Sequence, residues 1–266
     1  MQQISEKYKN EINILGDFCG IRDVPELNRT ELKRKYGIEK ADVMVLFGGS
    51  ILCGGDVLAK AMKNNVAEKY IIVGGAGHTT PMLRDKMNKI FPDWNTKELT
   101  EAELFSEYLQ RKYLLQVDYI EEKSSNCGNN ITLLLKLMKD KEVKCNSIIL
   151  CQDATMQHRM DATLRKYHND WMIINYAAYQ VHVINSMGKL IYENMPVGMW
   201  DMERYVTLLM GEIPRLTDDK DGYGPNGTGF IFHVDVPDDV ANAFIALKEK
   251  NNDFVREANP EFKDSL

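Results

Sequence analysis

Short apolar runs alternate with longer amphipathic stretches through the middle of the chain. The apolar runs are rich in β-branched residues and bounded by glycine or polar residues, as buried strands of a parallel sheet are. They cover Asp42–Phe47, Lys69–Gly75, Val117–Glu121, Ser147–Gln152 and Trp171–Asn175. Helical periodicity fills the intervals, chiefly at Asp56–Asn64, Thr100–Tyr113, Asn130–Lys139 and Thr155–Tyr167. The pattern predicts an α/β fold with a doubly wound, mainly parallel sheet, whose ligands bind beyond the carboxyl ends of the strands.

Both flanks of this region lack the alternation. We expect residues 1–40 to be a helical lead-in, residues 41–180 to form the core domain, and residues 181–266 to form a C-terminal α+β cap packed on the core. The cap should contain an amphipathic helix at Met199–Glu212, a Gly/Asp-rich loop, an extended segment at Phe230–Val236 and a helix from about Asp238.

Composition narrows the class of protein. A chain of 266 residues can bury a full core, and its 44% hydrophobic and 27% charged residues are typical of globular proteins. The net charge of −6 argues against nucleic acid as a partner. No run approaches the roughly 20 apolar residues that span a bilayer, and the start lacks a signal peptide. The cysteines form no CxxC motif, which favours reduced thiols and a cytoplasmic location. The oligomeric state stays open.

Three loops at predicted strand ends are rich in small or polar residues. The first two, "FGGSILCGG" (Phe47–Gly55) and "GGAGHTTP" (Gly74–Pro81), contain glycines that let backbone N–H groups approach a ligand, although glycine also ends strands in ordinary turns. Gly48-Gly49-Ser50 after the first strand is not GxGxxG, and no GxxxxGK[ST] occurs, which argues against a P-loop enzyme or an ordinary dehydrogenase. We expect a small-molecule ligand at this edge.

The third loop, "SSNCGNN" (Ser124–Asn130), precedes a helix. Its hydroxyls, amides and backbone N–H groups predict a neutral cradle for a polar or anionic group. Cys127 at the helix start is either a thiolate nucleophile or a small loop residue, and the absence of a nearby histidine favours the second. The acids Glu101 and Glu121 are candidates for proton transfer. We predict no metal site, because the histidines and the Thr217–Thr228 loop match no strong ligand pattern.

Three segments carry a resemblance to a known family. "EEKSSNCGNN", "CQDATMQHRM" and "ERYVTLLMGEIPRLTDDKDGYGPNGTGFIFHVDVP" resemble the YdcF branch of the YdcF/SanA/ElyC family, over about Asp42 to Val236. The resemblance implies a Rossmann-like fold, and it implies S-adenosylmethionine as the ligand. The SanA and ElyC branches carry a membrane anchor that this chain lacks.

The resemblance can be carried over residue by residue. The family pattern S-x-N-T-x-E-N falls on Ser124, Asn126, Cys127, Asn129 and Asn130. Cys127 stands at a threonine position and Asn129 at a glutamate position, which removes an acid from that site. The fourth-strand motif matches Gln152, Asp153, Thr155, Met156 and Arg159, with Ala154 replacing proline and His158 replacing arginine. Thr100-Glu101-Ala102 resembles the family's Ser-Glu-Ala, which makes Glu101 the strongest acid candidate.

Together these patterns define a hypothesis for the site. The catalytic candidates are Glu101, Glu121 and Asp153. The predicted ligand-binding residues are Gly48, Gly49, Ser50, Gly74, Gly75, Gly77, His78, Ser124, Ser125, Asn126, Cys127, Asn130, Gln152, Asp153, Thr155, Arg159, Asp221 and Tyr223. The last two would belong to a wall that the Gly/Asp-rich loop folds over the sheet edge.

We interpret the chain as a YdcF-like protein that binds a small nucleotide-type ligand, first of all S-adenosylmethionine, and that could use it as a transferase. Two alternatives remain open at this point. One is a hydrolase or transferase acting on a phosphorylated cell-envelope precursor. The other is a non-catalytic ligand-binding or sensing module.

Overall fold

Five parallel strands form the central sheet in the part of the chain that the structure describes, as the sequence predicts. The computed structural model describes residues 5–49, 51–77 and 79–249. The strands pair in the order β3-β2-β1-β4-β5, and every neighbouring pair is parallel. Their bounds are β1 (Ala41–Phe47), β2 (Ala67–Val73), β3 (Tyr119–Glu121), β4 (Ser147–Cys151) and β5 (Met172–Asn175). The fold is a Rossmann-like α/β fold.

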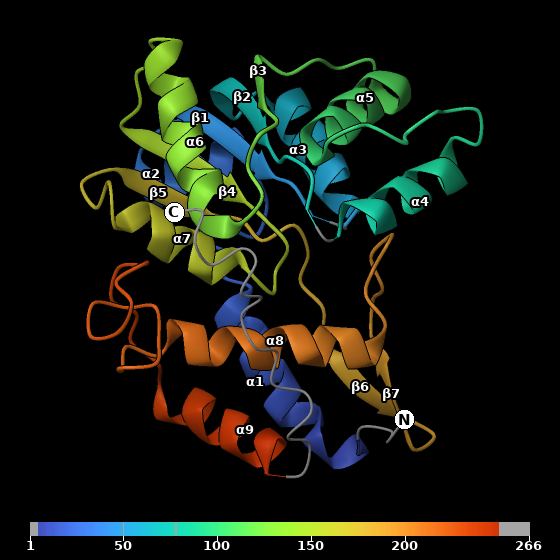
Figure 1. Cartoon of the computed structure of the whole chain (residues 1–266), viewed down its shortest axis with the longest axis vertical. Helices are drawn as coiled ribbons and strands as arrows, with labels where there is room; N and C mark the ends of the chain where they lie inside the picture. The colour runs from blue at the N-terminus through green and yellow to red at the C-terminus, as the bar shows by residue number, and fades with distance from the viewer. Residues whose placement is uncertain (1–4, 50, 78, 250–266) are drawn as a thin grey trace.

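Helices cover both faces of this sheet (Figure 1). The helices between the strands are α3 (Cys53–Asn64), α4 (Thr80–Ile90), α5 (Glu101–Tyr113), α6 (Cys127–Asp140) and α7 (Gln157–Arg165). Side chains of β1 alternate between the faces, so that Val43, Val45 and Phe47 pack with α6 and α7. Met44 and Leu46 pack in the core that includes α3 and α5. Burial on both faces explains why the strands are nearly continuous apolar runs.

The strand order creates a switch point between β1 and β4. From β1 the chain adds β2 and β3 on one side, and then returns to add β4 and β5 on the other. Connections that leave in opposite directions open a crevice at the carboxyl ends of the two central strands. The loops after β1 and β4 therefore border the same crevice.

A second layer lies beside the sheet and is built from the N-terminal and C-terminal segments of the chain (Figure 1). It contains α1 (Lys9–Cys19), β6 (Val183–Ser186), β7 (Lys189–Tyr192), α8 (Met202–Leu216) and α9 (Asp238–Lys248). The first helix packs against both α8 and α9, and its residues Ile12 and Leu15 are buried. The helical lead-in predicted for residues 1–40 thus divides, because α1 joins the C-terminal elements while α2 (Arg29–Tyr36) follows separately.

Two features of the cap region differ from the sequence reading. The strands β6 and β7 form an antiparallel hairpin that was not expected. Its turn residues Met187 and Gly188 both have positive φ, as tight hairpin turns require. The extended segment Phe230–Val236 has no strand partner, but Ile231 and Val234 are buried. Among the described residues no helix combines the length and apolar character needed to span a membrane.

Candidate functional site

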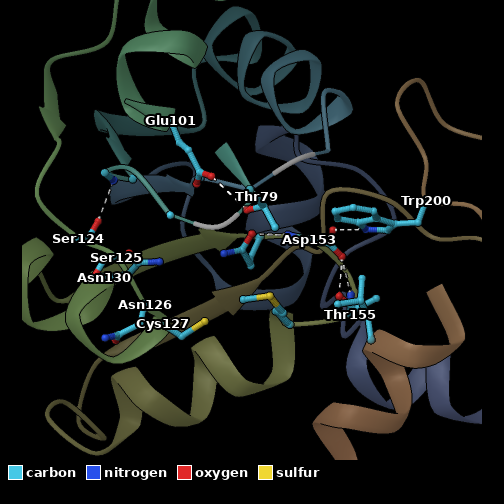
Figure 2. A pocket seen from close by; sticks show the side chains of 18 of the residues that line it. Thr79, Glu101, Ser124, Ser125, Asn126, Cys127, Asn130, Asp153, Thr155 and Trp200 are labelled. Carbon is cyan, nitrogen blue, oxygen red and sulfur yellow. Dashed lines mark hydrogen bonds between the residues drawn. The ribbon is translucent and has the colours of Figure 1, made fainter. Parts of the chain in front are cut away.

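A cleft opens at the carboxyl ends of β1, β2 and β4, next to the switch point (Figure 2). Its volume is about 730 Å³, including the part that is open to solvent. Many of the residues predicted from the sequence meet there: Gly48, Gly49, Gly74, Gly75, Gly77, Glu101, Ser124, Ser125, Asn126, Cys127, Asn130, Gln152, Asp153 and Thr155. The predicted residues Ser50 and His78 lie outside the described residues.

Two other predicted residues stabilise the surroundings without lining the cleft. Glu121 accepts hydrogen bonds from the backbone N–H groups of Lys123 and Ser124, at 2.7 and 3.2 Å, and thereby holds the turn before α6. Arg159 pairs with Glu212 through two parallel hydrogen bonds, in which its Nε donates to Oε2 and its Nη2 donates to Oε1 at 2.9 Å. These contacts give Glu121 and Arg159 structural roles.

The Gly/Asp-rich loop is not a wall of this cleft, unlike the prediction for Asp221 and Tyr223. The loop follows the C-terminal end of α8, whereas the residues of α8 that reach the cleft are near its other end. Tyr223 packs edge-to-face on Phe230, and Asp221 is exposed. His233 Nδ1 lies 2.6 Å from Asp218 Oδ2 and fastens the loop to the segment after it.

The wall that faces the sheet edge comes instead from the start of α8 and the segment before it. The lining residues that the sequence hypothesis did not include are Thr79, Trp200, Arg204 and Leu208, whereas Met156 belongs to the fourth-strand motif. The amphipathic pattern predicted a helix here, but it contains no sign of which face would meet the sheet edge. Figure 2 shows Trp200 across the cleft from the loop that carries Ser124 and Cys127.

Glycines at the strand ends make room for Glu101. A Cβ atom on Gly48 would lie 2.5 Å from Glu101 Oε2, and one on Gly74 would lie 3.0 Å from Glu101 Cβ. Only hydrogen fits at these positions, so β1 and β2 let the first residue of α5 reach the cleft.

The Glu101 carboxyl is buried and forms no ion pair with a described residue. Burial raises its pKa, and hydrogen bonds from the hydroxyls of Thr80 and Thr79, together with the charge of the nearby Arg84, oppose this effect. The two hydroxyls donate to Oε1 at 3.0 and 3.3 Å. The nearby Arg84 donates to the carbonyl of Leu99 instead. Glu101 is therefore a group that can hold a proton closer to neutral pH than an exposed glutamate can.

Many polar groups of the loop before α6 form hydrogen bonds with one another. Asn126 is the N-cap of α6, and its Oδ1 accepts from the N–H of Asn129 at 2.9 Å. Asn129 Oδ1 in turn accepts from the N–H groups of Ser125 and Asn126. Ser124 accepts from the N–H of Gly75 and so ties the loop to the end of β2. At Asn129, where the family resemblance expects an acid, the amide performs the capping function.

Gln152 lines the cleft, and its side chain carries a buried donor that no described residue satisfies. The residue is only 1% exposed. Oε1 accepts from the N–H of Asp153 at 2.7 Å, but Nε2 has no hydrogen-bond partner. The neighbouring amide of Gln157 differs, because its Nε2 donates both to the Leu150 carbonyl and to Asn175. A buried, unpaired donor is rare and points to an acceptor supplied by something else.

The Asp153 carboxylate accepts four hydrogen bonds. Oδ1 accepts from the N–H and hydroxyl of Thr155, both at 2.9 Å, and from the Tyr179 hydroxyl at 2.7 Å. Oδ2 accepts from the indole N–H of Trp200 at 2.8 Å. Asp153 thus positions the far wall of the cleft against the end of β4, and it does not offer a free oxygen for proton transfer.

Cys127 is buried at the start of α6. Burial raises the pKa of its thiol, and the nearby Arg159 guanidinium opposes that rise. The thiol form is favoured, which agrees with the reading of Cys127 as a small loop residue. No group of three or more metal-binding side chains occurs in the residues that the structure describes.

No known family model matches the chain. Among solved structures it is similar to the E. coli tRNA N6-threonylcarbamoyladenosine dehydratase TcdA, with a TM-score of 0.32 and 13% sequence identity, over 85% of this chain and 95% of that one. A second structure, of TcdA (CsdL), has a TM-score of 0.32 and 12% identity over the same shares of the two chains. At these values neither similarity bears on function.

Proposed function

We propose that this protein binds a small nucleoside-type ligand in the cleft at the carboxyl edge of its sheet, with S-adenosylmethionine as the first candidate. The observation that carries the proposal is Gln152 Nε2, a buried donor with no acceptor among the described residues. Leaving such a group unpaired costs about 1–3 kcal/mol, which a ligand carrying an acceptor would recover.

The rest of the cleft supports a ligand of this class. Its place at the switch point is where Rossmann-like sheets bind nucleotides. The Glu101 carboxyl offers an acceptor for hydroxyl or amino groups, as a nucleoside carries. The sequence resemblance to the YdcF branch is the reason for placing S-adenosylmethionine first. If the protein transfers a group, Glu101 is the side chain that exchanges the proton.

Calorimetric titration tests the proposal. S-adenosylmethionine, S-adenosylhomocysteine and adenosine are titrated into the wild type, Gln152→Met and Gln110→Met. Gln110 is exposed on α5, so its substitution is a matched surface control. We expect the wild type and the control to bind alike, and Gln152→Met to bind roughly 5- to 100-fold more weakly.

The loss of the acceptor for the Asp153 N–H affects free and bound protein equally, so it cancels in the comparison. Thermal denaturation checks that each variant is folded. A wild type that binds none of the three compounds, or a Gln152→Met variant with unchanged affinity, would contradict the proposal. Native mass spectrometry of the purified protein would identify a ligand of another class.

A further inference from the structure

Arg204 faces the cleft from the cap side. It lies in the first turn of α8, whose N-cap Asp201 accepts from the Arg204 N–H at 2.8 Å. Its side chain is half-buried and lines the cleft, with the guanidinium carbon 5.8 Å from the centre of the Trp200 ring. The helix cap and the indole, which is itself fixed by Asp153, hold this arginine at the cleft wall.

The guanidinium of Arg204 has no hydrogen-bond or ion-pair partner among the described residues. Every other arginine in that part of the chain donates from its guanidinium to a carboxylate or a carbonyl oxygen. An arginine that is half-buried and yet unpaired is therefore an exception within this protein. Its planar donors remain available to an acceptor in the cleft.

The carboxylates of the cleft do not satisfy it. Asp153 is filled by hydrogen bonds from Thr155, Tyr179 and Trp200. Glu101 accepts only from threonine hydroxyls and forms no ion pair with any described residue. The cleft thus has an acidic group at the sheet edge and an uncompensated cation on the cap.

We propose that Arg204 binds an anionic group of the ligand, so that the cleft selects a nucleoside that carries a carboxylate or a phosphate over one that does not. This inference rests on the proposed function and specifies its ligand class. Guanidinium groups bind both anions through paired N–H donors. The nucleoside part would then lie toward Gln152 and Glu101, and the anionic part toward α8.

The test compares ligand pairs that differ in the anionic group. One pair is S-adenosylmethionine and its decarboxylated form, and the other is AMP and adenosine. Each compound is titrated into the wild type, Arg204→Gln, Arg204→Lys and Lys220→Gln. Lys220 is exposed on the cap and does not line the cleft, so its variant controls for the loss of one positive charge.

We expect the wild type and Lys220→Gln to prefer the anionic member of one pair, and that pair identifies the group as carboxylate or phosphate. Arg204→Gln should weaken binding of this member roughly 10- to 100-fold and leave the other member within about 3-fold. Arg204→Lys should retain part of the preference, because lysine keeps the positive charge but lacks the paired N–H donors of the guanidinium group.

Three results would overturn the inference. If Arg204→Gln binds both members as the wild type does, the proposed function stands and the role of Arg204 falls. If it weakens both members equally, Arg204 only shapes the wall through Trp200. If the wild type binds no compound of either pair, the inference and the proposed function fail together.

Discussion

Glu101 and Asp153 are both buried carboxyl groups at the same cleft, yet their surroundings assign them different roles. Asp153 is saturated by four donors that come from the sheet edge and the cap. Glu101 receives two hydroxyl groups on one oxygen only. Sequence alone could name both as acids but could not separate them, since the partners Tyr179 and Trp200 are distant along the chain.

The raised pKa of Glu101 predicts a pH dependence of stability. Its folded-state pKa is above the ordinary value of 4.5, so the stability linked to its proton is full below about pH 4.5 and is lost as pH rises through the folded-state pKa. Glu101→Gln keeps an oxygen for Thr80 and has no charge to bury. We therefore expect its free energy of unfolding in urea to fall less than that of the wild type between about pH 4 and pH 8.

Glu98→Gln is the control for this experiment, because Glu98 is exposed in the loop before α5. It should reproduce the wild-type pH profile. A Glu101→Gln profile parallel to that of the wild type would mean that the burial of this carboxyl has no energetic effect.

At the scale of elements, the contact between the end of β2 and the loop before α6 decides whether the cleft can form. Gly75 lies where this contact is tightest. A Cβ there would overlap the Ser124 carbonyl oxygen and lie 2.7 Å from that of Glu122. Gly77, two residues later, has space, since the nearest atom to its Cβ would be the Ser125 oxygen at 3.7 Å.

This difference predicts opposite outcomes for two similar substitutions. Gly75→Ala should lower the free energy of unfolding by about 1–3 kcal/mol, because backbone atoms must move apart. Gly77→Ala should stay within about 0.5 kcal/mol of the wild type. Urea denaturation of the two variants measures both values. Equal stability of the two variants would show that the loop adapts without strain.

The elements also mark the limit of sequence reasoning for this fold. Buried parallel strands are continuous apolar runs, so the five strands and most helices were predictable, and so were the loops at the strand ends. The hairpin Val183–Tyr192 was missed, although its alternation and the Met187-Gly188 turn are hairpin signals. The wall formed by Trp200 and Arg204 was not predictable, because it depends on how α8 docks against the sheet edge.

At the scale of the whole molecule, polar side-chain contacts join the cap to the sheet layer near the cleft. Lys86 of α4 donates to the Gly198 carbonyl at 2.7 Å and lies 4.8 Å from the centre of the Trp200 ring. Arg159 of α7 and Glu212 of α8 form an ion pair with side chains that are 14% and 7% exposed. The geometry of the cleft depends on these links, because its walls come from both layers.

The Arg159–Glu212 pair predicts strongly non-additive substitutions. Arg159→Met leaves the Glu212 carboxylate buried without its partner, which should lower the free energy of unfolding by about 3–5 kcal/mol. The double variant Arg159→Met/Glu212→Met removes both charges and should recover most of that loss. Urea unfolding of the wild type, the two single variants at Arg159 and Glu212, and the double variant gives the coupling energy of the pair as a double-mutant cycle. Additive losses would mean that the pair is not coupled.

The packing of α1 has a consequence for how the chain is made. Ile12 and Leu15 are covered by elements that include α8 and α9, which leave the ribosome long after α1 does. During synthesis the apolar face of the first helix therefore stays exposed to solvent until the whole sheet and then α8 and α9 have been synthesised. A chain that stops before α8 would keep that side open permanently. Prematurely terminated products should consequently be substrates for chaperones and proteases, even when their sheet is complete.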